Sequence, residues 1–188
     1  MRAKARKRRR RSWALSVVLV LVALGAGGVL ASRAIRDSRA IAALDDALVT
    51  SRIQGRTQET RRRFERLMED YRGSRAAWAA HGHLGELEAA NGGFKEARAL
   101  WQRLAEGGPA DLAADAEMSL ILLDREQGRF EELAERLESL VESGGSHLPE
   151  DVLLFELAQT LEQLGRYEEA GRILRFQEIA PEAPRVRR

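Results

Sequence analysis

Apolar residues recur every three or four positions through the part of the chain that follows residue 36, and charged residues fill the positions between them. This spacing places the apolar side chains on one face of a helix. No stretch alternates apolar and polar residues for long enough to predict a strand. The clearest helical sets are Phe94, Ala97, Leu100, Trp101 and Leu104; Phe130, Leu133, Leu137, Leu140 and Val141; and Tyr167, Ala170, Ile173 and Leu174. The pattern predicts an all-α body.

The N-terminal part of the chain follows a different pattern. Residues 12–32 form an uncharged run of 21 residues. A helix of that length reaches about 30 Å, which is the thickness of the hydrocarbon core of a bilayer. We therefore predict a single transmembrane helix over residues 12–35.

The charges beside this run predict its orientation. Residues 1–11 hold eight basic residues and no acidic one, whereas the remainder of the chain is acidic, with 23 basic against 29 acidic residues. Because basic flanks stay in the cytoplasm, residues 1–11 are predicted as a cytoplasmic arm and the body as extracytoplasmic. The expected localisation is the inner membrane, and attraction to anionic lipid accounts for the arm without a nucleic-acid partner.

A cleaved signal peptide is the alternative for the same segment. A basic region, an apolar region and small residues near Ala31 also fit an export signal that is cut near residue 31. The uncharged run is longer than the apolar core of most signal peptides, which favours the uncleaved span. Both interpretations export the body, the second as a soluble periplasmic protein.

The aromatic residue that begins each second helix recurs at a fixed distance. Phe94, Phe130 and Tyr167 are 36 and 37 residues apart, and a glycine precedes each of them by two residues. A step of 37 back from Phe94 reaches Thr57, where Gly55 takes the place of the glycine. A period of this size predicts a solenoid of stacked helix pairs that reverse at the glycines. We expect about four pairs over residues 36–181, followed by a tail at 182–188.

The residues of the repeat resemble the tetratricopeptide repeat (TPR). The resemblance rests on Leu84, Gly85, Gly92, Phe94, Ala97 and Trp101 in the second copy, and on Leu157, Ala158, Gly165, Tyr167, Ala170 and Leu174 in the last. The third copy departs from the family with Leu133 at an alanine position, and the spacing exceeds the family's 34 residues. The resemblance implies an α-solenoid that binds proteins.

With its single span and basic arm, the whole chain resembles bacterial membrane-anchored TPR proteins, such as the ancillary subunit of the Sec translocon in Gram-negative bacteria. This resemblance implies a scaffold that assists Sec-dependent export or periplasmic chaperone networks, with the translocon or exported chains as partners. The alternative is a scaffold for assembly of an envelope complex such as a pilus, a secretion apparatus or a division complex.

Candidate chemistry is sparse. The chain has no cysteine, and His81 and His83, two residues apart, point about 200° away from each other on a helix, so they cannot share a metal as residues four apart would. The pair Glu131 and Glu132 fits an exposed helix face. The sequence predicts no catalytic, cofactor-binding or metal site, and therefore no enzyme.

A partner groove is the remaining candidate. The resemblance implies that the first helix of each pair lines it, and the third and fourth copies place large apolar residues there. We expect Leu154, Leu157 and Ala158 to face the core, which leaves other apolar residues of the same helix exposed for a contact. Coverage by neighbouring helices and self-association remain alternatives. The candidate groove residues are Met118, Leu122, Arg125, Val152, Phe155 and Gln159.

Overall fold

The computed structural model describes residues 32–179, and this part of the chain is helical with no strand. The first helix covers residues 32–54. The others are α2 (Gln58–Asp70), α3 (Arg75–Ala90), α4 (Phe94–Gly107), α5 (Ala110–Glu126), α6 (Phe130–Ser143), α7 (Glu150–Gln163) and α8 (Tyr167–Ile179). The predicted all-α architecture is confirmed for these residues.

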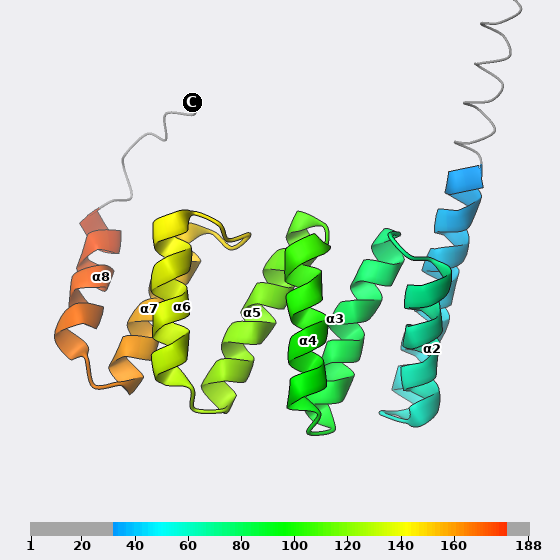
Figure 1. Cartoon of the computed structure of the whole chain (residues 1–188), viewed down its shortest axis with the longest axis horizontal. Coiled ribbons are helices and arrows are strands. Elements are labelled where there is room, and N and C mark those ends of the chain that lie inside the picture. The colour runs from blue at the N-terminus through cyan, green and yellow to red at the C-terminus, as the bar shows by residue number, and fades with distance from the viewer. Residues whose placement is uncertain (1–31, 180–188) are drawn as a thin grey trace, which may run out of the picture.

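The helices stand in one elongated array in chain order, and each packs against the next (Figure 1). They form four antiparallel pairs, called units 1 to 4 below. Unit 1 is residues 32–54 with α2, unit 2 is α3 with α4, unit 3 is α5 with α6, and unit 4 is α7 with α8. The prediction of about four stacked helix pairs is confirmed.

The turn inside each unit depends on the predicted glycine. Gly55, Gly92, Gly128 and Gly165 have φ values of 71°, 82°, 67° and 74°. A side chain at this φ would strain the backbone, so glycine allows the tight reversal that ends each first helix. At Gly92, the backbone N–H donates to the carbonyl of Ala89 at 3.0 Å.

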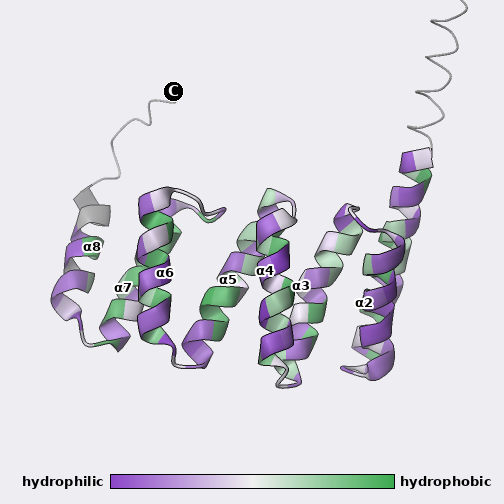
Figure 2. Ribbon diagram, in the orientation of Figure 1, coloured by the Kyte–Doolittle hydropathy of each residue, from purple (hydrophilic) through white to green (hydrophobic). Residues whose placement is uncertain are grey.

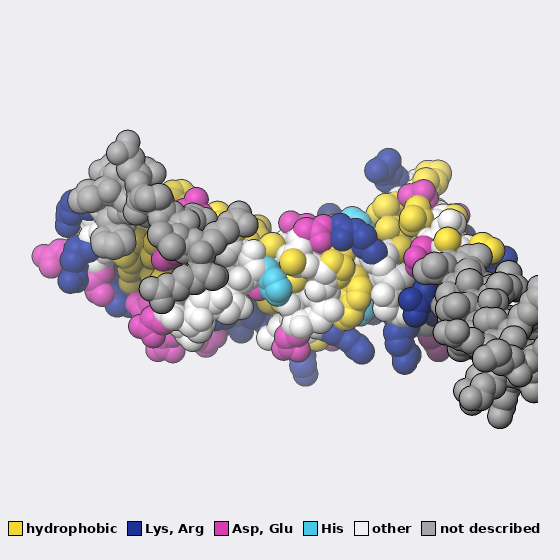
Figure 3. All heavy atoms as spheres, turned by 90° about the horizontal axis from the view of Figure 1, so that it is seen from above, with side chains coloured by type: hydrophobic (Ala, Val, Ile, Leu, Met, Phe, Trp, Pro, Cys, Tyr) yellow, Lys and Arg dark blue, Asp and Glu magenta, His cyan; other side chains and the backbone are white. Residues whose placement is uncertain are grey.

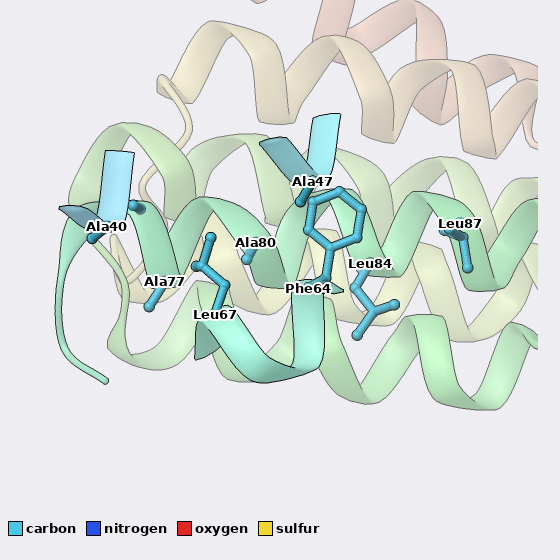
Figure 4. Packing of buried hydrophobic residues seen from close by; sticks show 9 residues of the cluster. Ala40, Ala47, Phe64, Leu67, Ala77, Ala80, Leu84 and Leu87 are labelled. Carbon is cyan, nitrogen blue, oxygen red and sulfur yellow. The ribbon is translucent and has the colours of Figure 1, made fainter. Parts of the chain in front are cut away.

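Unit 1 uses the positions that its degenerate sequence predicted. Phe64 and Leu67 are 1% and 2% exposed, and they pack with Ala40 and Ala47 of the helix 32–54 (Figure 4). Figure 2 shows that the rest of α2 is strongly hydrophilic. The apolar stripe therefore packs this helix against the array, and ion pairs of Arg61 with Glu88 and of Arg63 with Asp46 add to the attachment.

The small residue at Gly85 has a steric reason. A Cβ placed there would lie 2.4 Å from Nε1 of Trp101. The same indole N–H donates to the carbonyl oxygen of Gly82 at 3.3 Å. Residue 85 of α3 must therefore lack a side chain, because Trp101 of α4 packs directly against the helix backbone at this point.

The core face of α7 differs by one residue from the expectation. Leu157 and Ala158 are buried as predicted, but Leu154 is only half-buried, and Leu153 is buried in its place. The reason is that α7 packs between α6 and α8, so that its buried side is centred near Leu153 and Leu161.

The membrane predictions fall mostly outside the described residues. Residues 12–31 of the predicted span lie outside them, as do the arm at 1–11 and the tail at 182–188. Residues 32–35 begin the first described helix. None of the helices within residues 32–179 is long and apolar enough to cross a membrane. The transmembrane helix stays a prediction.

Candidate partner-binding face

The exposed sides of α3, α5 and α7 form a surface that we call the first-helix face. On α5 it lies opposite Leu120 and Asp124, which are buried against the neighbouring helices. The residues of this face that matter below are Ala79, Gly82 and Glu86 of α3; Asp115, Met118, Leu122, Arg125 and Glu126 of α5; and Val152, Phe155, Gln159 and Glu162 of α7.

Two predicted groove residues are the apolar centre of this face. Leu122 of α5 is 52% exposed and Phe155 of α7 is 48% exposed. Met118 lies one turn before Leu122 and is half-buried, as are Val152 and Gln159 on α7. Other large apolar side chains are exposed on the helix 32–54 and on α8, but Leu122 and Phe155 lie on two neighbouring first helices, which makes the pair a candidate contact site.

Arg125, the remaining predicted groove residue, has a structural role. Its guanidinium forms an ion pair with the carboxylate of Glu156, a residue of α7 that is largely buried. The pair joins α5 and α7 one turn beyond Leu122 and next to Phe155. It therefore joins the two helices that carry the exposed apolar side chains.

The other end of the face is different in shape and chemistry. Ala79, Gly82 and Glu86 line a hollow of about 90 Å³ between α3 and α5. A second hollow of about 280 Å³ lies between α3 and the helix 32–54, and its lining includes Arg52 and Glu86. On α3, small and polar side chains thus take the place of the large apolar ones of α5 and α7, whereas the helix 32–54 of unit 1 exposes large apolar side chains of its own: Ile35, Ile41, Val49 and Ile53.

Acidic side chains surround the apolar centre. Asp115 and Glu126 are exposed on α5 on the same side as Leu122, because they are seven residues before it and four after it. Glu162 is exposed on α7, seven residues after Phe155. The TPR resemblance maps Asp115 and Glu162 onto groove positions, whereas Glu126 was not expected at this site. The composition of α5 and α7 carries the same acidic signal. Together they hold nine acidic residues and one basic residue, Arg125.

A set of buried ion pairs fixes the first helices in place. Asp124 of α5, 4% exposed, pairs with Arg98, Arg129 and Arg136, the last two at 3.0 and 2.9 Å. Glu88 stands at the equivalent position of α3 and pairs with an arginine of α2. These ion pairs were not predicted from the sequence, although both acids precede a turn glycine by four residues.

Burial changes the titration of two charged groups in these clusters. It raises the pKa of Glu88, and the nearby carboxylates Glu96 and Glu65 act in the same direction, against the effect of Arg61. It lowers the pKa of Arg136. Both shifts reflect the loss of water around a charge.

The histidines take packing roles. Nδ1 of His81 lies 2.8 Å from the carbonyl oxygen of Ala77, and its ring lies 5.2 Å from that of Trp78. Burial lowers the pKa of His81. His83 contacts Glu86 at 3.3 Å on the first-helix face. Within residues 32–179 no three His, Asp or Glu side chains are placed to hold a metal ion.

Figure 3 shows charged side chains along both long edges of the molecule, with apolar groups exposed between these edges. Because the helix 32–54 also exposes large apolar side chains, the first-helix face is one of several candidate contact surfaces.

The comparisons with known proteins agree with the architecture. No known family matches the sequence, and no curated protein does. Among the solved structures that match is a kinesin light chain-type protein of Podospora anserina with nearly identical TPR-like repeats. It is 18% identical, the match covers 78% of each chain, and the TM-score is 0.57. The described part of the chain is thus a TPR-like α-solenoid in fold.

Proposed function

We propose that the chain is a membrane-anchored scaffold, with its helical body outside the cytoplasm, that binds protein partners on the first-helix face. It acts by holding partners near the membrane and carries no catalytic step. The resemblance of its layout to the ancillary Sec subunit makes Sec-dependent export or the chaperoning of exported chains the leading process.

The observation that carries the proposal is the exposure of Leu122 and Phe155 on adjacent first helices. Leaving such side chains in water forgoes the stabilisation of burial, about 1.5 to 3 kcal/mol for a full side chain. A protein partner that covers them recovers that stabilisation. The Arg125–Glu156 pair supports the proposal because it holds the two helices, and so the contact surface, together.

Site-specific photocrosslinking in the native cell tests the binding face. A photoreactive residue is placed at Met118, Leu122 or Phe155, and at exposed Glu131 of α6 as the control. Translocon subunits or exported chains captured at the first three positions support the proposal. One recurrent envelope component would assign the protein to an assembly complex, and adducts to its own chain alone would refute the partner face.

The anchor and its orientation are tested separately. The mass of the protein isolated from membranes distinguishes the uncleaved span from a form that lacks about 31 residues. Replacing the basic residues of 1–11 with acidic ones should disturb the topology, measured with a reporter fused to the C-terminus. Unchanged export of the reporter would overturn the role given to the arm.

A further inference from the structure

The apolar centre of the first-helix face has a one-sided charge environment. Leu122 has Asp115 and Glu126 on its own helix face, and Phe155 has Glu162 on its own. The basic group nearby, Arg125, is engaged by Glu156. A ligand that covers the two apolar side chains therefore meets uncompensated carboxylates around them.

The acidic character extends beyond the rim. From residue 76 to residue 179 the chain holds nine basic and 21 acidic residues, whereas residues 33–75 hold eleven basic and seven acidic ones. The potential therefore becomes negative toward units 3 and 4, where the exposed apolar pair lies. Charges of one sign around a contact surface select partners of the opposite sign and accelerate their encounter.

We propose that the surface around Leu122 and Phe155 binds a short apolar segment flanked by lysine or arginine residues on a partner protein. This inference rests on the proposed function and names the chemistry of its partner. The apolar stretch covers the two exposed side chains, and the flanking cations lie against Asp115, Glu126 and Glu162. An apolar segment with acidic flanks is rejected because like charges would face each other at the rim.

The polar end of the same face sets a limit on the contact. Ala79 and Gly82 offer no large apolar side chain, and Arg52 lines the neighbouring hollow. An apolar stretch therefore gains little on α3, although Glu86 and Asp115 at this hollow can still meet a flanking cation. The apolar part of the contact lies on α5 and α7, a span suited to a short segment of about ten residues.

Peptide binding to the full-length protein in nanodiscs of zwitterionic lipid tests the inference. The probe is a fluorescent peptide of eight leucines and alanines with two lysines at each end. Its two controls have glutamates in place of the lysines, or serines in place of the apolar core. Fluorescence anisotropy, corrected for empty nanodiscs, should show binding of the first peptide at least about tenfold tighter than of either control. The preference over the acidic peptide should shrink in high salt, which screens exposed charges.

Two variants separate the apolar and the charged contributions. Leu122→Ser with Phe155→Ser should weaken the lysine-flanked peptide by about tenfold or more. Asp115→Lys with Glu126→Lys and Glu162→Lys should reverse the preference toward the glutamate-flanked peptide. Tyr167→Ser, which changes an even more exposed large side chain on α8, is the control and should bind as the parent does. Circular dichroism should show unchanged helicity in all three.

The outcomes distinguish the partner chemistry from the scaffold role. Equal affinity for the lysine and glutamate peptides, or no effect of the rim reversal, overturns the inference. If crosslinking from Leu122 and Phe155 still captures a partner whose contact segment lacks basic residues, the scaffold function is supported and the proposed basic flanks of the partner segment are refuted. Binding that appears only after removal of residues 180–188 would make the chain's own basic tail the occupant, and crosslinks between copies would make it a second chain. Either result overturns the inference.

Discussion

Apolar clusters join units 2 and 3 and units 3 and 4, but one pair of equivalent repeat positions holds an ion pair at the first junction and apolar side chains at the second. At the first, Arg98 of α4 pairs with buried Asp124 of α5. The equivalent positions at the second, four residues after the aromatic and four before the turn glycine, are Ala134 and Leu161. Both are 1% exposed and belong to one apolar cluster.

From one junction to the next, the residues at these two equivalent positions change together. At these repeat positions the charged junctions have a base on the second helix and an acid on the next first helix, whereas the last junction has neither and its ion pair, Arg125–Glu156, joins two first helices. This is what the energetics require, because one partner without the other leaves a buried charge uncompensated. A buried ion pair and an apolar pair are thus alternative ways to stack the same unit, and each is sensitive to a different substitution.

The largest expected effect is a charge placed in the apolar junction. Leu157→Asp puts a carboxylate where the native side chain is 4% exposed, among apolar neighbours. A loss of more than about 4 kcal/mol is expected, which should unfold unit 4. Hydrogen exchange should show fast amides confined to α7 and α8.

Phe155→Asp on the same helix is the control for this experiment. The side chain is 48% exposed, so the carboxylate stays hydrated and the protection of α7 should persist. Comparable loss of protection in both variants would mean that helix propensity, and not burial, limits the stability of unit 4.

The next largest effect is the loss of the acid from the charged junction. Asp124→Ala leaves Arg98, Arg129 and Arg136 without the carboxylate that they share. Breaking a buried ion pair on one side costs about 3 to 5 kcal/mol. Urea denaturation should show this decrease in the free energy of unfolding, whereas Glu126→Ala, an exposed site on the same helix, should change it by about 0.5 kcal/mol or less.

Sequence periodicity predicted the array because each unit repeats the same apolar positions. Gly55, Phe64 and Leu67 could be placed by a step of 37 residues even where unit 1 is degenerate, since packing retains size and polarity at a position. Leu154 was assigned to the wrong side because a run of apolar residues does not fix the rotation of a helix to within one residue.

The candidate site was predictable in part. The exposure of Leu122 and Phe155 followed from an apolar surplus that one helix face cannot bury. The ion pair of Arg125 could not be predicted, because its partner Glu156 is 31 residues away and does not occupy a position that the repeat pattern pairs with Arg125. Long-range ion pairs depend on how adjacent units rotate against each other, which the sequence pattern of a single unit does not contain.

A smaller effect is expected at the junction between units 1 and 2, where Glu88 pairs with one arginine. Arg61→Ala removes the partner of Glu88, whose side chain is 4% exposed, and should cost about 1 to 3 kcal/mol. The double variant Arg61→Ala with Glu88→Leu recreates the apolar junction of unit 4. Its free energy of unfolding should lie closer to that of the parent than the Arg61→Ala variant does. A double variant less stable than Arg61→Ala would show that this junction cannot accept an apolar pair.

The smallest effect is the pH dependence of the charged junction. The pKa of Glu88 is raised above its ordinary value of 4.5, chiefly by burial. Between pH 4.5 and the raised pKa, the folded protein therefore binds more protons at this site than the unfolded chain, so this contribution to stability grows as the pH falls from neutrality toward 4.5. Relative to Glu88→Gln, which cannot titrate there, the parent should become more stable over this range, measured by urea denaturation at each pH.

Glu131→Gln, an exposed site in α6, controls for the change of net charge and should show no such trend at this junction. A parent that loses stability relative to Glu88→Gln on acidification would mean that the attraction of Arg61 outweighs burial, and that the charged junction stabilises the array through its ionised form.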